Sequence, residues 1–304
     1  MSETAVDLRA KYLVDPYLNW AKAQGVPIVE SVTLDLFALE TMPWARFGMN
    51  GAICHVEGRC DFLSAFLFEL APGQSSAPSR HLYEECFCVL EGEGVSEIQL
   101  SNGDRHEIAW APGVIFTTPV NATCRLMAHG ASRARLLSLN DMRYLMGLYR
   151  NEAFLFNNAS PMSVRQAKAL ESSLHVDLAG LDSGAALQLG DSAIGADYIR
   201  LAPGAKTPAT RQMQGAHLLC TGGEATILSC LDEACERTTT RLRHGCLTGL
   251  TGMLFHQQDN QGQGPLGLLK VELGSQASPL FRSRRAAFGD QDVYASGSAV
   301  LAGI

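Results

Sequence analysis

The sequence lacks the long apolar runs and the excess of basic residues that mark membrane-spanning and nucleic-acid-binding proteins. No uncharged apolar run approaches the roughly 18 residues of a membrane span, and residues 1–24 have no apolar core of the signal-peptide type. Lys and Arg number 24 against 31 Asp and Glu, a formal net charge of -7, whereas nucleic acids and anionic membranes bind clustered positive charge. We therefore expect a cytoplasmic protein that binds a small organic molecule, and neither nucleic acid nor a membrane.

The sequence also lacks the cysteine pattern of a disulfide framework or a structural zinc site. The 9 cysteines are an odd number, and several lie in apolar, strand-like runs where a reduced thiol acts as a small hydrophobe. Cys86 and Cys88 would share one face of a strand, but no second pair stands at zinc-site spacing. With 46% apolar and 18% charged residues over 304 positions, the composition predicts about two ordinary globular domains.

What the sequence does contain is an internal repeat. The stretch 70–94, LAPGQSSAPSRHLYEECFCVLEGEG, has a degraded copy that begins at Leu201, 131 residues further on. A repeat at a fixed offset indicates two similar structural units, one in each half of the chain. The shared positions are Leu70/Leu201, Ala71/Ala202, Pro72/Pro203, Gly73/Gly204, Arg80/Arg211, Gly92/Gly223 and Glu93/Glu224.

Short apolar runs separated by Gly and Pro turns fill both halves. Residues 62–70 and 85–90 are typical, and such spacing predicts antiparallel β-sandwiches or barrels. Apolar residues at helical spacing predict a helix over 5–24, with a break or second start at Pro16, and a linking helix over 141–153. A second linking helix is predicted over 163–174. The expected organisation is an N-terminal helix and arm (1–56), a first barrel (57–140), a helical linker (141–180), a second barrel (181–273) and a tail (274–304).

The repeated stretch carries a recognisable motif. Pro72-Gly73 is followed by His81, by Glu85 and, at the spacing usual for the motif, by Gly92. This order resembles the first motif of the cupin superfamily, which places Ser79 at the first His position of that motif and His81 at the second. The segment 119–124 resembles the second motif and puts Cys124 where the family has its last His. The resemblance implies an all-β chain of two antiparallel cupin, or jelly-roll, barrels.

As architecture, the run from N-terminal helix through two barrels is similar to the gentisate 1,2-dioxygenase group of bicupins. That likeness implies a homo-oligomer and one divalent metal, Fe(II), Zn(II) or Mn(II), in the first barrel. Four positions of the second half correspond to the four metal ligands of the family. Only one of them, His256, holds a residue type that binds metal there, since the others are Thr210, Gln212 and Ala216. We expect no metal in the second barrel.

The residues of the first barrel leave three functional interpretations open. In the first, the metal has been lost and a small-molecule pocket persists, in which His81 and Glu85 only form hydrogen bonds. In the second, His81, Glu85 and Cys124 bind a divalent metal in a dioxygenase-like oxidoreductase that acts on a small aromatic acid. In the third, Cys124 is a nucleophile activated by His81 in an isomerase or hydrolase.

Three further residues are candidates for substrate binding. Arg80 is a candidate clamp for a substrate carboxylate, because a guanidinium binds a carboxylate through two parallel hydrogen bonds. Trp44 and Arg46 lie in a segment that could line a site, and a core or rim position is the alternative for Trp44. Glu84 and Glu85 must point to opposite faces of a strand, and the spacing to Gly92 favours Glu85 as the inward carboxylate.

Overall fold

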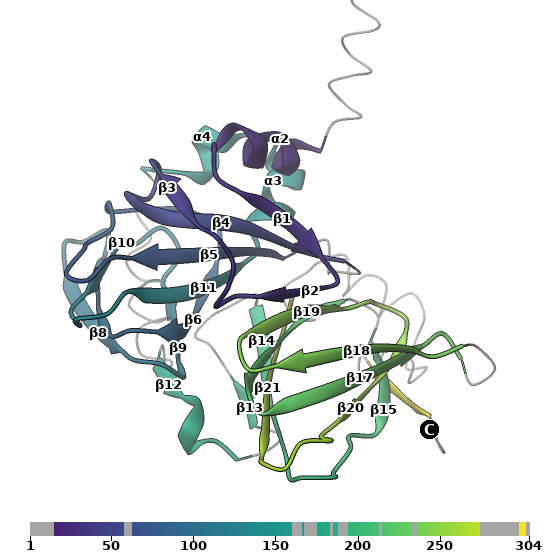
Figure 1. Ribbon diagram of the computed structural model, residues 1–304. Helices are drawn as coiled ribbons and strands as arrows, with labels where there is room; N and C mark the ends of the chain where they lie inside the picture. The colour runs from purple at the N-terminus through teal and green to yellow at the C-terminus, as the bar shows by residue number, and fades with distance from the viewer. Residues whose placement is uncertain are drawn as a thin grey trace, which may run out of the picture.

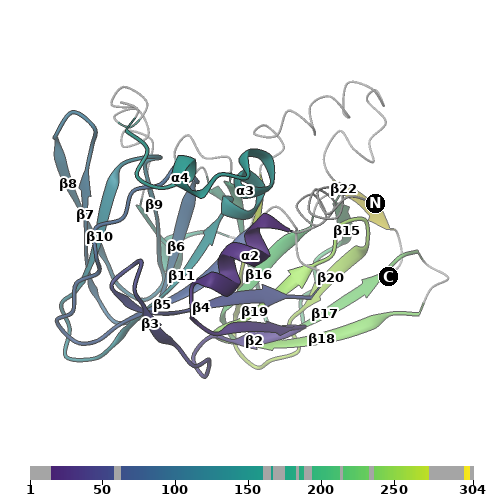
Figure 2. The ribbon, with the colours of Figure 1, turned by 90° about the horizontal axis from the view of Figure 1, so that it is seen from above.

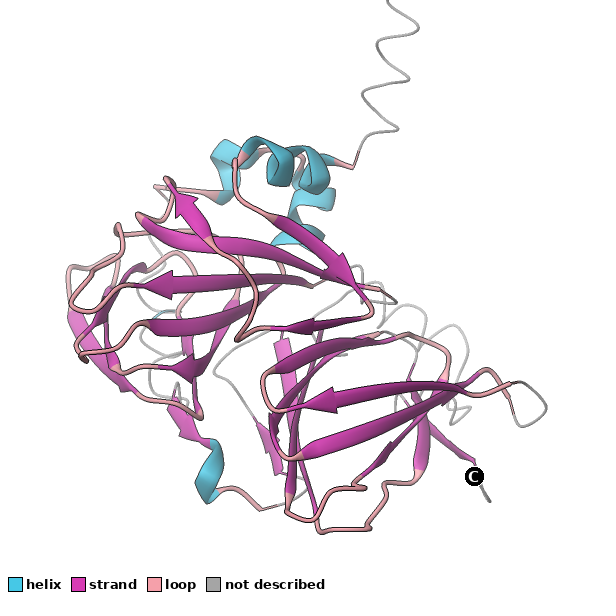
Figure 3. Ribbon diagram, viewed as in Figure 1, coloured by secondary structure: helices cyan, strands magenta, loops and turns pink. Residues whose placement is uncertain are grey.

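The structure is a computed structural model that describes residues 15–57, 63–159, 166, 175–182, 185–187, 194–212, 215–232, 236–273 and 298–301. It confirms an all-β fold of two barrels (Figures 1 and 3). Strands dominate both halves, and the α-helices lie together at one end of the first barrel. Within the described residues, no helix has the length and apolarity needed to cross a membrane.

The first barrel consists of a large sheet facing a small one. In the described residues the large sheet has the order β1-β4-β5-β11-β6-β9-β12, with β3 paired to β4, and the small sheet has the order β10-β7-β8. Pairing is antiparallel except between β1 and β4, which run parallel. The strands are β1 (Ile28–Ser31), β3 (Met42–Trp44), β4 (Met49–Val56), β5 (Ser64–Leu70), β6 (Glu85–Glu91), β7 (Gly94–Gln99), β8 (Arg105–Trp110), β9 (Val114–Thr118), β10 (Thr123–Ala128), β11 (Ala134–Asn140) and β12 (His175–Asp177).

The second barrel repeats this plan. Its sheets, as far as the structure describes them, have the orders β13-β14-β21-β16-β19-β2 and β18-β17-β20-β15-β22. The strands are β2 (Thr33–Asp35), β13 (Ala185–Leu187), β14 (Ile194–Leu201), β15 (Ala209–Gln212), β16 (Ala216–Gly222), β17 (Glu224–Cys230), β18 (Thr238–Arg243), β19 (Cys246–Leu250), β20 (Phe255–Asp259), β21 (Leu266–Leu273) and β22 (Ser298–Leu301).

Three apolar clusters hold the molecule together. One fills the first barrel and is rich in aromatic side chains, and a smaller one fills the second barrel. The third lies between the barrels and combines residues of both, such as Leu67 and Leu137 from the first with Leu219 and Leu269 from the second. The large sheets of the two barrels therefore pack on each other, as their neighbouring positions in Figure 1 indicate.

The helices cover the first barrel (Figure 2). Helix α2 (Pro16–Ala23) starts at Pro16, and Asp15 caps it by accepting hydrogen bonds from the backbone N–H groups of Tyr17 and Leu18. The predicted helix start at Pro16 is thus confirmed, while residues 5–14 of the predicted helix lie outside the described residues.

The predicted linking helix over 141–153 is two helices, α3 (Met142–Tyr149) and α4 (Glu152–Leu155). Arg150 takes a left-handed conformation with φ of 50° and ends α3. The 3-10 helix η1 (Leu178–Gly180) follows β12. The helix predicted over 163–174 lies outside the described residues except for Gln166.

Residues 28–39 cross from one barrel to the other. Strand β1 pairs with β4 of the first barrel, and β2 pairs with β19 of the second. The buried Arg135 of β11 holds the following turn, because its guanidinium donates to the carbonyl groups of Leu36, Phe37 and Leu39. Its Nε also donates to Glu69 at 2.7 Å. This segment joins the two barrels.

Candidate functional site

Strand β6 directs Glu85 into the first barrel. Along this strand Phe87 and Val89 belong to the cluster inside the barrel, whereas Cys86 and Cys88 belong to the cluster between the barrels. Glu85 lies two residues before Phe87, so its side chain points to the same face of the strand, where it contacts the buried His81. The shared face predicted for Cys86 and Cys88 is confirmed, and it looks toward the second barrel. The seven cysteines of the described chain are all buried and free.

His81 and Glu85 form the centre of a buried hydrogen-bond network. Both are 4% exposed, and His81 Nε2 lies 3.1 Å from Glu85 Oε2. The hydroxyl of Ser138, on β11, donates to Glu85 Oε1, and Asn140 Nδ2 donates to Ser138 Oγ at 3.0 Å. The strand pairing brings these groups together, because Ser138 lies opposite Phe87 and Asn140 opposite Glu85.

The contacts of the His81 ring decide which of its nitrogens can donate a hydrogen bond. His81 Nδ1 lies 2.9 Å from the carbonyl oxygen of Tyr83, which only accepts, so Nδ1 carries a hydrogen. The contact between Nε2 and Glu85 then needs one further proton, placed on the imidazole or on the carboxyl group. The two side chains therefore share a hydrogen bond that the barrel encloses.

Cys124 lies in the same barrel but outside this network. It is 4% exposed on β10, and its backbone pairs with that of Ser79. Burial, and secondly the Glu85 carboxylate, raises the pKa of the Cys124 thiol. Among the described residues, no group of three or more His, Cys, Asp or Glu side chains is arranged to hold a metal ion. The structure thus brings His81 and Glu85 together and does not group Cys124 with them as ligands.

Aromatic side chains close this end of the barrel. The Tyr83 ring stacks on the His81 ring with centroids 3.5 Å apart, and Phe156 meets Tyr83 edge-on at 5.7 Å. Trp20 of α2 stacks on Phe156 from another side. Tyr83 Oη and Trp20 Nε1 are buried and have no hydrogen-bond partner in the described part of the chain. An unpaired buried donor is costly, so both groups suit an acceptor atom of a bound molecule or of water.

The three predicted substrate-binding residues take different positions. Trp44 is 1% exposed and belongs to the barrel core, with its Nε1 bonded to Gln24. The Arg46 guanidinium lies 4.2 Å from the centre of the Phe156 ring and pairs with Glu152. Arg80 Nη2 donates to the carbonyl oxygen of Asn157 at 3.1 Å. Both arginines therefore stand beside the segment that covers His81, and Trp44 does not.

The second barrel has a satisfied histidine at the corresponding place. His256 Nε2 donates to the Thr251 carbonyl at 2.8 Å, so Nδ1 accepts from the Ser229 hydroxyl, also at 2.8 Å. Burial lowers the pKa of His256, against the opposing effect of the Thr251 hydrogen bond. Thr210 lies opposite His256 in the pairing of β15 with β20, and Ala216 begins β16. The arrangement holds a neutral imidazole.

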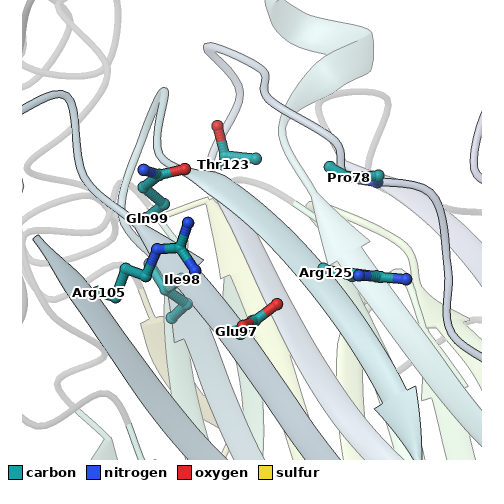
Figure 4. Close-up of a pocket in the computed structure, with 7 residues that line it drawn as sticks. All are labelled: Pro78, Glu97, Ile98, Gln99, Arg105, Thr123 and Arg125. Atoms are coloured by element: carbon teal, nitrogen blue, oxygen red, sulfur yellow. The ribbon is translucent and has the colours of Figure 1, made fainter. Parts of the chain in front are cut away.

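A groove of about 320 Å³ lies on the outer face of the small sheet of the first barrel (Figure 4). Thr123 and Arg125 line it, and they flank Cys124 on β10, whose side chain points to the opposite face. Arg105 of β8 and Arg125 lie on opposite sides of β7. The groove is therefore separated from the His81–Glu85 network by the sheet itself.

Sequence reasoning missed five residues of the site: Trp20, Tyr83, Ser138, Asn140 and Phe156. Ser138 and Asn140 were detectable, because they are polar residues in the otherwise apolar run RLLSLN, and a buried hydroxyl or amide needs a partner. Phe156 gave no such signal, since it reaches His81 only through a bridge between separate segments.

Two jelly-roll barrels in one chain make up a bicupin fold. Among solved structures, the chain is similar to a variant of oxalate decarboxylase from Bacillus subtilis, with 11% identity, a TM-score of 0.57 and coverage of 90% of this chain and 89% of the other. It is also similar to the formate complex of Lactobacillus farciminis oxalate decarboxylase, with 11% identity, a TM-score of 0.57 and coverage of 88% and 97%. No family model and no curated protein matches the sequence. These likenesses establish the fold.

Proposed function

We propose that this protein is a small-molecule-binding bicupin whose first barrel works without a bound metal and whose second barrel is inert. The observation that carries the proposal is the closed network of His81, Glu85 and Ser138. The two ligand-type side chains that the sequence retains satisfy each other, and their further polar contacts are to protein groups.

The donor set fits a metal poorly. A metal ion would have to displace the His81–Glu85 contact and the Ser138 hydrogen bond, and it would gain only two strong ligands. Recruiting Cys124 as a third ligand requires its thiolate, yet burial and the Glu85 charge favour the neutral thiol. The backbone of Ser79 pairs with that of Cys124, and as a metal ligand its side chain could supply only a hydroxyl group.

The ligand class that we propose is a small organic acid with an aromatic ring. The covering layer of Tyr83, Phe156 and Trp20 supplies flat apolar surfaces and two unpaired donors. Among the described residues, the Arg80 guanidinium donates one hydrogen bond, to the carbonyl oxygen of Asn157. Its other N–H groups are therefore available to bind a carboxylate. Solved proteins of the same fold include oxalate decarboxylases, one of them with formate, so the fold accommodates small carboxylates.

The second candidate function is the dioxygenase-like oxidoreductase with His81, Glu85 and Cys124 as metal ligands. The observation in its favour is that Glu85 lies close enough to Cys124 for its charge to raise the pKa of the thiol. The Cys-dependent isomerase or hydrolase is disfavoured by the same effect, because the nucleophile would be a thiolate.

The test is calorimetric titration of chelator-treated protein with benzoate, gentisate and, as a smaller acid, oxalate. We expect at least one aromatic acid to bind without metal, and Arg80→Gln to weaken its binding about tenfold, which corresponds to the loss of a charge-assisted contact. Arg105→Gln, in the separate groove of Figure 4, is the matched control. Binding that appears only after Fe(II), Mn(II) or Zn(II) is added would replace the proposal with the second candidate.

A further inference from the structure

A second cavity lies between the two barrels. It has a volume of about 210 Å³, and its walls come from β6 and β9 of the first barrel, from β16 of the second and from the 3-10 helix of the linker. It adjoins the apolar cluster that both large sheets share. The cavity is distinct from the His81–Glu85 network, which lies on the inner face of β6.

The wall of this cavity is mainly apolar. Leu90, Ile115, Leu178 and Leu219 line it, together with the thiols of Cys88 and Cys220. Burial raises the pKa of Cys220 to about 11, so this thiol is neutral at neutral pH. Among the described residues that line the cavity there is no Asp, Glu, Lys or Arg. A charged ligand would lose its hydration there without gaining a counter-charge.

One polar group of the wall has no partner. The hydroxyl oxygen of Thr221 is buried and forms no hydrogen bond to any described residue. It stands at the irregularity in the pairing of β16 with β21, between Cys220 and Gly222. His244, the other polar side chain of the lining, is exposed and packs edge-on against Phe37 at 5.1 Å. His244 therefore marks the solvent side of the cavity, whereas the half-buried Thr221 contributes a hydroxyl oxygen that is closed to solvent.

We propose that the inter-barrel cavity binds a neutral, single-ring aromatic molecule with one hydroxyl group, which bonds to Thr221. Size supports this choice, because an apolar cavity of about 150 Å³ in another protein accepts benzene, and this one is somewhat larger at about 210 Å³. The apolar wall provides the ring contacts, and the unpaired hydroxyl selects a hydrogen-bonding substituent over a bare ring.

Calorimetric titration of the full chain with phenol, benzene and benzoate tests the proposal. We expect phenol to bind with one site per chain, and benzoate to bind about tenfold or more weakly at this site, because its charge is not compensated. Thr221→Val keeps the shape and removes the hydroxyl, so it should weaken phenol about fivefold to tenfold and leave benzene unchanged. Cys88→Phe fills the cavity and should abolish the binding of both neutral rings.

Circular dichroism and thermal unfolding show whether each variant is folded, and the nearly isosteric Thr221→Val keeps the test decisive if Cys88→Phe is not. His81→Ala should retain phenol binding, which separates this cavity from the site in the first barrel. The proposal is overturned if phenol at millimolar concentration does not bind. It is also overturned if benzoate binds as tightly as phenol and Cys88→Phe abolishes that binding, or if Thr221→Val lowers the affinities for benzene and phenol equally.

Discussion

Ser138 determines how the Glu85 carboxyl group is held. Its hydroxyl donates to one carboxyl oxygen while His81 contacts the other, and all three residues are nearly inaccessible to solvent. A carboxyl group placed in this way keeps its orientation without a metal. These side-chain contacts alone orient the carboxyl group, so we expect the hydroxyl of Ser138 to be needed for stability.

Ser138→Ala should lower the free energy of unfolding by about 1–3 kcal/mol, since it leaves a buried carboxyl oxygen and the Asn140 amide without their partner. Urea unfolding measures this cost. The same substitution in a Glu85→Leu background should cost clearly less, because the carboxyl group is gone. Equal costs in the two backgrounds would show that the hydroxyl does not act through Glu85.

His256 supplies a pH dependence of stability. Its native pKa lies below the ordinary 6.5, so the unfolded chain binds a proton at a higher pH than the native chain does. The contribution of His256 to stability is therefore complete above pH 6.5 and is lost as the pH falls from there toward the lower native pKa.

Urea unfolding between pH 5 and 8 should show this loss with a slope of at most about 1.4 kcal/mol per pH unit for one proton. His256→Gln should flatten the profile, because the glutamine amide still donates to Thr251 and does not titrate. His106→Gln, at an exposed residue, should leave the slope unchanged. A profile as steep in His256→Gln as in the natural chain would contradict this assignment.

Among the elements, the crossing segment 28–39 depends on one buried arginine. Arg135 bonds to three backbone carbonyl groups of this segment and to Glu69 on the neighbouring strand. Its side chain is 5% exposed, whereas that of Arg133, which also pairs with Glu69, is 44% exposed. The arginine on β11 is thus buried, whereas the arginine just before this strand is exposed.

Arg135→Met should lower the free energy of unfolding by about 3–5 kcal/mol, because it leaves three carbonyl groups without their donor and removes the shorter of the two arginine contacts to Glu69. Arg133→Met should cost less than about 1 kcal/mol, as expected for an exposed ion pair. Chemical denaturation of both variants provides the comparison. Similar small losses in the two would mean that Arg135 does not anchor the crossing segment.

The turns of both barrels were predictable from the repeat. Gly92 and Gly223 take nearly the same left-handed φ, 77° and 78°, and a Cβ atom at Gly92 would lie 2.6 Å from Ala134. Local patterns of this kind also predicted the β6 strand and the inward direction of Glu85. They could not predict that Ser138, 53 residues away, meets that carboxyl group, because strand order depends on contacts between distant parts of the chain.

In the whole molecule, the apolar cluster shared by the two barrels predicts that they unfold as one cooperative unit. Leu247 belongs to this cluster from the side of the second barrel, together with Leu67 and Leu137 of the first. The three tryptophans of the sequence, Trp20, Trp44 and Trp110, all lie in the first half. Their fluorescence therefore reports the first barrel alone, and circular dichroism reports both.

Leu247→Ala should destabilise the protein by about 2–5 kcal/mol and shift the fluorescence and circular dichroism transitions by the same amount. Leu242→Ala, in the core of the second barrel, serves as a comparison for a residue that does not contact the first. A fluorescence midpoint that stays constant in Leu247→Ala while the circular dichroism transition moves would show that the barrels unfold independently.

The central claim is that the first barrel holds its His81–Glu85 pair without a metal. It is tested most directly by elemental analysis of protein purified without a His tag, before and after incubation with Fe(II), Mn(II) or Zn(II), for the natural chain, His81→Ala and Cys124→Ser, with His129→Ala as the exposed-histidine control. We predict a metal content near zero in all four proteins. Close to one equivalent of metal in the natural chain and in His129→Ala, lost in both His81→Ala and Cys124→Ser, would contradict the claim and establish the three-ligand centre.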